Sequence, residues 1–108
     1  RLVVIDDSIV RGNTSRKLVA MLRDAGAAEV HLRITSPEVL WPCFYGIDTA
    51  TREQLIAANM DIDEMNAWIG SDSLAFLSVA GLHEAVADAR HPSFCDACFT
   101  GEYPCVSM

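Results

Sequence analysis

The sequence has no long hydrophobic run: no stretch approaches the ~20 consecutive apolar residues of a membrane-spanning helix. It also shows no basic and then apolar leader of the secretory type. Basic residues are few, with 8 Lys and Arg against 15 Asp and Glu, and the formal charge of -7 disfavours nucleic acid and anionic membranes as partners. We therefore expect a cytoplasmic protein with neither a membrane nor a nucleic-acid partner.

Two signatures of nucleotide-binding enzymes are absent too. Neither G-x-x-x-x-G-K-[ST] nor G-x-G-x-x-G occurs, so a P-loop nucleoside triphosphatase and a dinucleotide-binding domain find no support. There is no internal repeat, and 108 residues with 51% hydrophobic content are enough for one domain with a buried core, residues 1–108. Because the sequence opens on Arg1 inside a predicted buried strand, we expect it to be a fragment of a longer protein.

Residues 1–35 have the hydrophobic pattern of a strand, a helix and a second strand. The run LVVI at residues 2–5 is apolar and rich in β-branched residues, which is typical of a strand buried on both faces. A helical stripe runs from about Thr14 to Ala25, and residues 29–34 alternate between apolar and polar. The sequence thus predicts an α/β fold with a parallel sheet flanked by helices.

Residues 36–108 form a second region, which we expect to be largely helical and to end in a cysteine-rich tail. Its long connection after residue 35 contains Pro37, Pro42 and Gly46 and is predicted to be irregular. We interpret His31, His83 and His91 as solvated surface histidines. The predicted elements are helices at 52–59 and 61–69, the second capped by Asp61, a strand at 73–79 and a helix at 82–89.

The first predicted strand leads into a polar loop that suits a phosphate group. Gly12 permits close approach of the backbone, and the hydroxyls of Thr14 and Ser15 stand at the start of a helix whose N-terminus carries partial positive charge. Arg11 and Asn13 add further donors. The loop and the start of the helix therefore indicate a monophosphate site at the carboxyl edge of the sheet.

Two carboxylates, Asp6 and Asp7, stand directly before this loop, where they would repel a phosphate that they touched. Carboxylates accept hydrogen bonds from vicinal hydroxyls and hold Mg²⁺, a cation that prefers carboxylate, phosphate and water oxygens. A phosphorylated ribose with a diphosphate on its anomeric carbon satisfies both the loop and the carboxylates. The alternative interpretation is a solvated acidic turn before an ordinary helix.

Of the four cysteines, Cys95 and Cys98 form a Cys-x-x-Cys pair, with Cys105 nearby and Cys43 far upstream. Disulfides are rare in cytosolic proteins, so this spacing is typical of a Zn²⁺ or iron–sulfur site. The alternative for Cys43 taken alone is a small buried hydrophobic residue.

The string VVIDDSIVRGNTS resembles the phosphoribosyl pyrophosphate (PRPP) motif of type I phosphoribosyltransferases. This resemblance implies that the acidic pair serves the ribose hydroxyls and Mg²⁺, and that the loop holds the 5′-phosphate. The PRPP-binding residues that it implies are Asp6, Asp7, Arg11, Gly12, Asn13, Thr14 and Ser15, of which Asn13 stands where the family usually has Thr.

Three later strings, PCFYGID, IGSDSLAFLS and FCDACFTGEYP, resemble landmarks of the glutamine-dependent amidophosphoribosyltransferases, in the same order. This family transfers ammonia from glutamine to PRPP, giving 5-phosphoribosylamine, glutamate and diphosphate, the first step of de novo purine synthesis. In its iron–sulfur branch, the positions of Cys43, Cys95 and Cys98 ligate a [4Fe-4S] cluster. The resemblance places the fourth ligand upstream, and Cys105 is an alternative.

The resemblance further implies a homo-oligomer with purine nucleotides as feedback inhibitors. It identifies the chain as the C-terminal part of the phosphoribosyltransferase domain, without the N-terminal glutaminase domain, so no catalytic residue is assigned and the chain alone is expected to be inactive. Two other hypotheses stay open, a non-catalytic PRPP-binding regulatory module and a zinc-stapled structural domain, although the latter leaves Asp6 and Asp7 unexplained.

Overall fold

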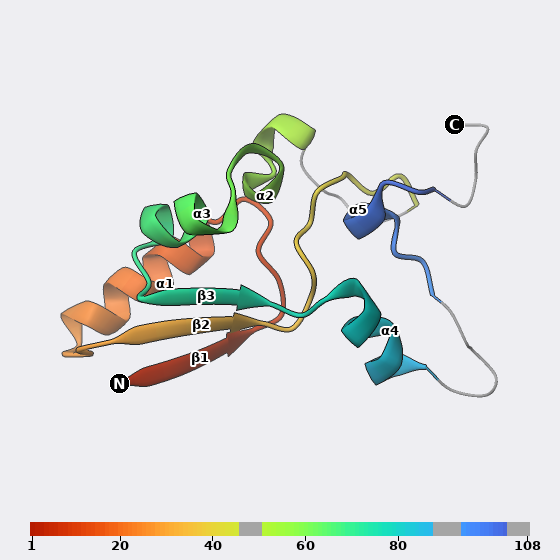
Figure 1. Ribbon diagram of the computed structural model, residues 1–108. Coiled ribbons are helices and arrows are strands. Elements are labelled where there is room, and N and C mark those ends of the chain that lie inside the picture. The colour runs from red at the N-terminus through yellow and green to blue at the C-terminus, as the bar shows by residue number, and fades with distance from the viewer. Residues whose placement is uncertain (46–50, 88–93, 104–108) are drawn as a thin grey trace.

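Three parallel strands form the centre of the structure, a computed structural model that describes residues 1–45, 51–87 and 94–103 (Figure 1). The strands are β1 (Leu2–Asp6), β2 (Val30–Ile34) and β3 (Ser73–Phe76), in the spatial order β1-β2-β3. Asp6 at the end of β1 lies beside Ile34 at the end of β2. The carboxyl ends of the strands therefore meet at one edge of the sheet, where side chains from the loops after them can converge.

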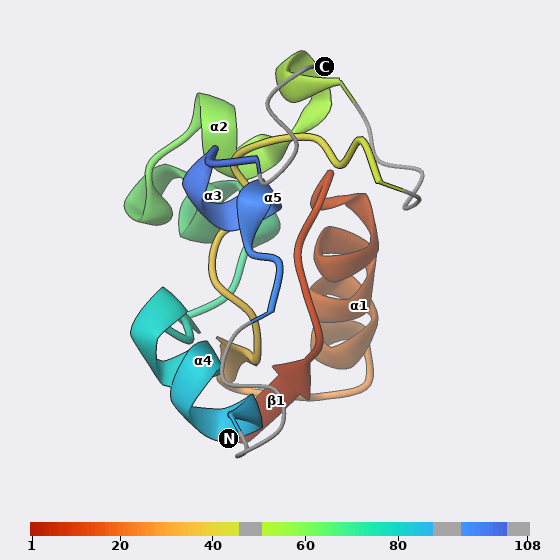
Figure 2. The same cartoon turned by 90° about the vertical axis from the view of Figure 1, so that its right-hand side faces the viewer.

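Helices lie on one face of the sheet and beyond its carboxyl edge. The helices α1 (Asn13–Asp24) and α3 (Ile62–Ile69) pack against each other, and α1 also contacts β2 while α3 contacts β3. The helices α4 (Val79–Val86) and α5 (Ala97–Thr100) lie past the ends of the strands (Figures 1 and 2). None of the helices in the described ranges is both long and apolar enough to cross a bilayer. Two further short helices in the described residues are η1 (Arg52–Gln54) and α2 (Ile56–Asn59).

The main core lies between the sheet and the helices that cover it. Alternate residues of β2 point into it, as their periodicity predicts, and Val30 and Leu32 are almost completely buried. Val19 of α1 and Met65 of α3 meet them from the helical side. Each such side chain stabilises the fold by roughly 1.5–3 kcal/mol relative to an exposed one. The βαβ unit predicted for residues 1–35 is confirmed.

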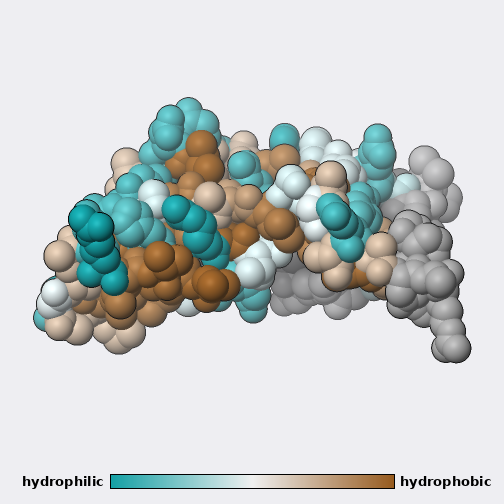
Figure 3. Space-filling view, turned by 60° about the horizontal axis from the view of Figure 1, so that its bottom comes forward, coloured by the Kyte–Doolittle hydropathy of each residue, from teal (hydrophilic) through white to brown (hydrophobic). Residues whose placement is uncertain are grey.

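The opposite face of the sheet is not covered by any described residue. Val3 and Ile5 of β1 are 67% and 70% exposed, and Ile5 lies beside Arg33 of β2. The view from below shows apolar side chains gathered over this part of the molecule (Figure 3). The continuous apolar run of β1 predicts burial on both faces, yet within the described chain only one face of the sheet is packed.

Two predicted helices differ from the structure. The prediction of one helix over 52–59 is wrong, because the structure has two short helices that are separated at Leu55. The backbone of Leu55 is extended, and its side chain is fully buried. Leu55 fills a second, smaller core with Val39, and an unbroken helix would not place it there. The helix predicted for 82–89 instead spans α4, one turn earlier, because the Ser78 side chain accepts a hydrogen bond from Gly81 N–H and caps it.

The cap predicted for α3 is confirmed in full. The Asp61 side chain accepts from the Glu64 N–H at 2.8 Å, while the Glu64 side chain accepts from the Asp61 N–H at 3.2 Å. Gly70 then ends the helix in the left-handed conformation. These local signals are therefore enough to predict both ends of α3 from the sequence.

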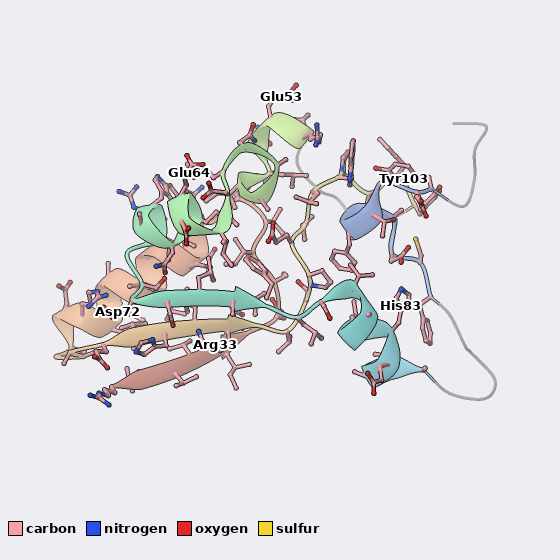
Figure 4. All side chains as sticks on the ribbon, in the orientation of Figure 1. Arg33, Glu53, Glu64, Asp72, His83 and Tyr103 are labelled. Atoms are coloured by element: carbon pink, nitrogen blue, oxygen red, sulfur yellow. The ribbon has the colours of Figure 1, made fainter. Side chains whose placement is uncertain are left out.

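Asp72 joins three elements at the amino end of the sheet. One oxygen of its carboxylate accepts hydrogen bonds from Val30 N–H at 2.7 Å and from the Arg23 guanidinium at 2.9 Å, and Arg23 also donates to the Gly70 carbonyl at 2.7 Å. The Val30 hydrogen bond, with the help of Arg23, holds the pKa of Asp72 below its ordinary value. The ionised carboxylate therefore stabilises the junction of α1, β2 and β3 (Figure 4).

We expect Asp72→Asn to lower the thermal unfolding midpoint at pH 7 by a few degrees, because it removes the charge that Arg23 and Val30 bind. A carboxyl group with a depressed folded pKa contributes its full stability above its unfolded pKa, near 4, and loses it as pH falls through the lower folded value. The difference between the two proteins should therefore shrink below about pH 4 in thermal melts recorded from pH 7 to pH 2. Asp24→Asn, at an exposed position, is the control, and an equal effect from it would contradict the role of Asp72.

Candidate functional site

A cleft of about 410 Å³ opens at the carboxyl end of β1. Its walls are one continuous segment that leaves β1, crosses the loop and enters α1. The structure thus brings together all seven residues predicted to bind PRPP. The lining residues are Asp6, Asp7, Ser8, Ile9, Val10, Arg11, Gly12, Asn13, Thr14 and Ser15.

The two carboxylates at one end of the cleft are fixed by short local contacts. Asp6 accepts from the Asp7 N–H at 2.8 Å, and Asp7 accepts from the Ser8 hydroxyl at 3.1 Å. Thr35, just past β2, donates its N–H to the Asp6 carbonyl at 2.9 Å. Asp6 is half-buried and Asp7 is exposed, so both carboxylates keep acceptor capacity for hydroxyls or a cation.

The other end of the cleft is the N-terminus of α1. Its N-cap is Gly12, so no side chain caps the helix, and the first turn contains no acidic residue. The N–H groups of this turn have no partners within the helix, and they carry partial positive charge. The exposed side chains of Arg11 and Thr14 lie beside these N–H groups. Ser15, in contrast, is buried and only 4% exposed. Backbone and side chains together therefore suit an anion with several oxygens.

The loop between these ends is held from behind by α2 and α3. Ile9 is buried in the main core, and the Val10 carbonyl accepts from the Ile56 N–H at 3.0 Å. A Cβ atom on Gly12 would lie 2.8 Å from Ile56 Cδ1 and 3.0 Å from Trp68 Cζ3. Sequence reasoning assigned Gly12 to phosphate approach and missed this packing, which only the tertiary contact of α2 and α3 reveals.

The predicted cysteine ligands come from two distant segments. Cys43 lies in the connection after β2, Cys95 precedes α5, and Cys98 lies inside α5. The Cys98 carbonyl accepts two hydrogen bonds from that connection, from Leu40 N–H at 2.9 Å and from Trp41 N–H at 3.0 Å. The fold therefore brings residues more than fifty positions apart in the sequence into one region. Cys105 lies outside the described residues.

Aromatic side chains lie beside these cysteines. The Tyr103 hydroxyl donates to the Pro42 carbonyl at 2.7 Å, and the Tyr103 ring centroid lies 5.1 Å from that of Phe44 and 6.0 Å from that of Tyr45 (Figure 4). These contacts tie the segment after α5 to the segment that carries Cys43. Apolar rings of this kind restrict the access of water to a site that they cover.

The Cys98 thiol is affected by burial and by the charges around it. Burial raises the pKa of Cys98, and negative charge on Cys43 and Cys95 raises that pKa further, while its own backbone N–H lowers it. A bound metal ion would reverse this balance, because its positive charge stabilises thiolates. The sulfur donors are thus of the type that iron or zinc prefers. Within the described ranges, however, no three His, Cys, Asp or Glu side chains already stand in metal-binding positions.

We expect Gly12→Ala to destabilise the protein by more than Gly26→Ala, although both glycines have positive φ. Alanine in the left-handed region costs about 1–2 kcal/mol at either position. At Gly12 the new methyl group also overlaps Ile56 and Trp68, which costs roughly 1–3 kcal/mol more, whereas Gly26 has open space around it. Urea unfolding of both variants measures the difference, and equal losses would show that the packing behind Gly12 contributes nothing.

No protein-family model matches the chain. It is 60% identical over 96% of its length to an amidophosphoribosyltransferase of Synechococcus elongatus, and 55% identical over 96% to a chloroplastic one of Arabidopsis thaliana. It spans about a fifth of the length of these relatives, 21% and 18%. A solved structure of the glutamine PRPP amidotransferase from B. subtilis, complexed with ADP and GMP, superposes with a TM-score of 0.86 at 54% identity, covering 96% of this chain and 24% of that one. In sequence and in fold, the chain is therefore similar to one segment of these amidophosphoribosyltransferases.

Proposed function

We propose that this chain is the PRPP-binding and cysteine-bearing segment of an amidophosphoribosyltransferase, a glycosyltransferase that converts PRPP and glutamine to 5-phosphoribosylamine, glutamate and diphosphate. One observation carries the proposal. A single cleft has two carboxylates at one end and an uncapped helix N-terminus at the other. A sugar phosphate with a free diol complements both ends, since its phosphate suits the helix and its hydroxyls suit the carboxylates.

The phosphate end of the cleft binds and orients the substrate. The first-turn N–H groups of α1 and the Thr14 hydroxyl donate to the 5′-phosphate, and the Arg11 guanidinium adds charge. Asn13 donates its amide N–H in the same place as the Thr hydroxyl usual in the family. Gly12 keeps the backbone close to the phosphate while its own rear side packs against α2 and α3.

The carboxylate end acts on the ribose. Asp6 and Asp7 accept hydrogen bonds from the two vicinal hydroxyls and hold the ring in a fixed orientation. Their negative charge also stabilises the positive charge that develops on the anomeric carbon as diphosphate leaves. Mg²⁺, held by the same two carboxylates and the diphosphate oxygens, would neutralise the leaving group.

In the proposed enzyme the cysteines have a structural role. Cys43, Cys95 and Cys98 ligate a [4Fe-4S] cluster, with a fourth ligand from upstream or from Cys105. The support is the donor type, the shared region of the three thiols, and the hydrogen bonds that join α5 to the connection after β2. Such a cluster would fasten the connection after β2 to α5.

We also propose how the enzyme that contains this chain is regulated and where in the cell it acts. The B. subtilis structure is a complex with ADP and GMP, and we propose purine nucleotides as feedback inhibitors of the homo-oligomeric enzyme that contains this chain. A cytoplasmic location suits a thiol-ligated metal site, because a reducing compartment keeps thiols available.

We expect the double variant Asp6→Asn, Asp7→Asn of the full-length protein to lose at least ~100-fold in PRPP-dependent activity, because the diol and Mg²⁺ lose both charged partners. Hydrolysis of glutamine to glutamate, which needs no group in this cleft, should continue. Asp63→Asn, at an exposed position on α3, is the matched charge-removal control. Normal phosphoribosylamine formation by the double variant would refute the proposed role of the cleft. Tight binding of PRPP by a wild-type protein with no transferase activity would favour the regulatory module.

We expect full-length protein purified without oxygen to be brown and to contain about four iron atoms per chain. Cys98→Ser should lose most of the iron, because Cys98 is the half-buried ligand that both segments surround. Cys105→Ser should lose it only if Cys105 is the fourth ligand, so the pair of variants also decides that question. A colourless wild-type protein with stoichiometric zinc would refute the cluster.

A further inference from the structure

Trp68 belongs to α3, yet it reaches the start of α1 from outside the cleft. The helix α3 packs against α1, and the half-buried Trp68 side chain packs against the main core (Figure 1). Its Cζ3 atom lies 3.0 Å from the point where a Cβ atom on Gly12 would stand. The indole ring therefore fills part of the space that a side chain at the N-cap of α1 would need.

The same ring contacts the other residue that closes the first turn of α1. The Gly12 carbonyl accepts a hydrogen bond from Arg16 N–H at 3.0 Å, which is the first hydrogen bond of the helix. The Arg16 guanidinium lies over the Trp68 ring, with its Cζ atom 4.7 Å from the ring centroid. Trp68 therefore contacts both residues that this hydrogen bond joins, although it does not line the cleft itself.

The position of this turn decides how well the cleft can bind a phosphate. The N–H groups of residues 13–15 have no partner within the helix, and no side chain caps them. Glycine at the N-cap can adopt many backbone conformations besides the left-handed one seen here, so Gly12 cannot fix the turn by itself. Contacts from other elements have to fix it, and Trp68 and Ile56 supply them.

We propose that Trp68 is a positioning residue for the phosphate end of the cleft: its ring holds the Gly12 turn so that the first-turn N–H groups stay directed at the phosphate. This inference rests on the proposed use of PRPP and goes beyond it, because Trp68 acts only through Gly12 and Arg16. The 5′-phosphate takes no part in bond breaking, so a displaced turn weakens the binding of substrate and transition state alike. Loss of Trp68 then raises the KM for PRPP and leaves kcat unchanged.

The test uses the full-length enzyme with Trp68→Leu and measures kcat, the KM for PRPP and inhibition by ribose 5-phosphate, which has the phosphate and the diol but no diphosphate. We expect the KM to rise about 10-fold and inhibition by ribose 5-phosphate to weaken by the same factor, with kcat within about twofold of wild type. Trp68→Phe keeps an aromatic ring on which Arg16 can stack, so its KM should rise only about threefold.

The matched control is Leu22→Ala, because Leu22 packs against the same core from near the other end of α1. It should lower the free energy of unfolding, measured in urea, while the KM for PRPP stays unchanged. An equal rise in KM from Leu22→Ala would overturn the inference, since any loosening of α1 would then be enough. A Trp68→Leu enzyme whose kcat falls while its KM stays unchanged would also overturn it, because that is the result of a merely structural role.

Trp68→Phe decides the matter if Trp68→Leu does not fold. An unchanged KM in the Trp68→Phe enzyme would overturn the inference, and a raised KM with unchanged kcat would support it. A wild-type enzyme that neither binds nor consumes PRPP would instead refute the proposed function, and that result is available before any variant is made.

Discussion

The left-handed turn at Gly12 is the constraint on which the cleft depends. With φ at 85° and its missing Cβ position occupied by Ile56 and Trp68, this residue reverses the chain between the loop and α1 without a side chain. A capping Ser or Asp here would occupy one of the first-turn N–H groups and place a side chain between the helix end and a ligand. Glycine leaves those groups unpaired and open to the cleft. The same residue therefore sets both the packing behind the loop and the chemistry in front of it.

A second, smaller core links the two candidate sites. Val39 and Leu55 are buried together, and Val10 of the cleft loop packs against them, as do Cys98 and Phe99 of α5. The break in the predicted helix at Leu55 has its reason here, because the extended backbone lets that side chain reach this core. The loop that lines the cleft and the turn that carries the cysteines thus rest on shared side chains, and a change in one bears on the position of the other.

The residues of the cleft could be predicted because they are consecutive. The loop after β1 lines the cleft by itself, so the order of residue types from Asp6 to Ser15 already gives its chemistry. The cap of α3 is equally local, since Asp61 and Glu64 are neighbours on one helical turn. In contrast, the contact of His83 with Asp96 spans thirteen positions and two helices, and neither residue carries a pattern that indicates the other.

The sequence by itself determined the elements whose signals are local: the βαβ unit, the capped α3, and the acidic pair followed by an uncapped helix start. Their hydrophobic periods and turn residues act within a few positions of each other. Only the tertiary structure decided how Gly12 is packed, where the predicted helix breaks at Leu55, and that His83 contacts Asp96. These features depend on side chains that come together from separate elements, and such contacts are set by the packing of the whole fold rather than by any single segment.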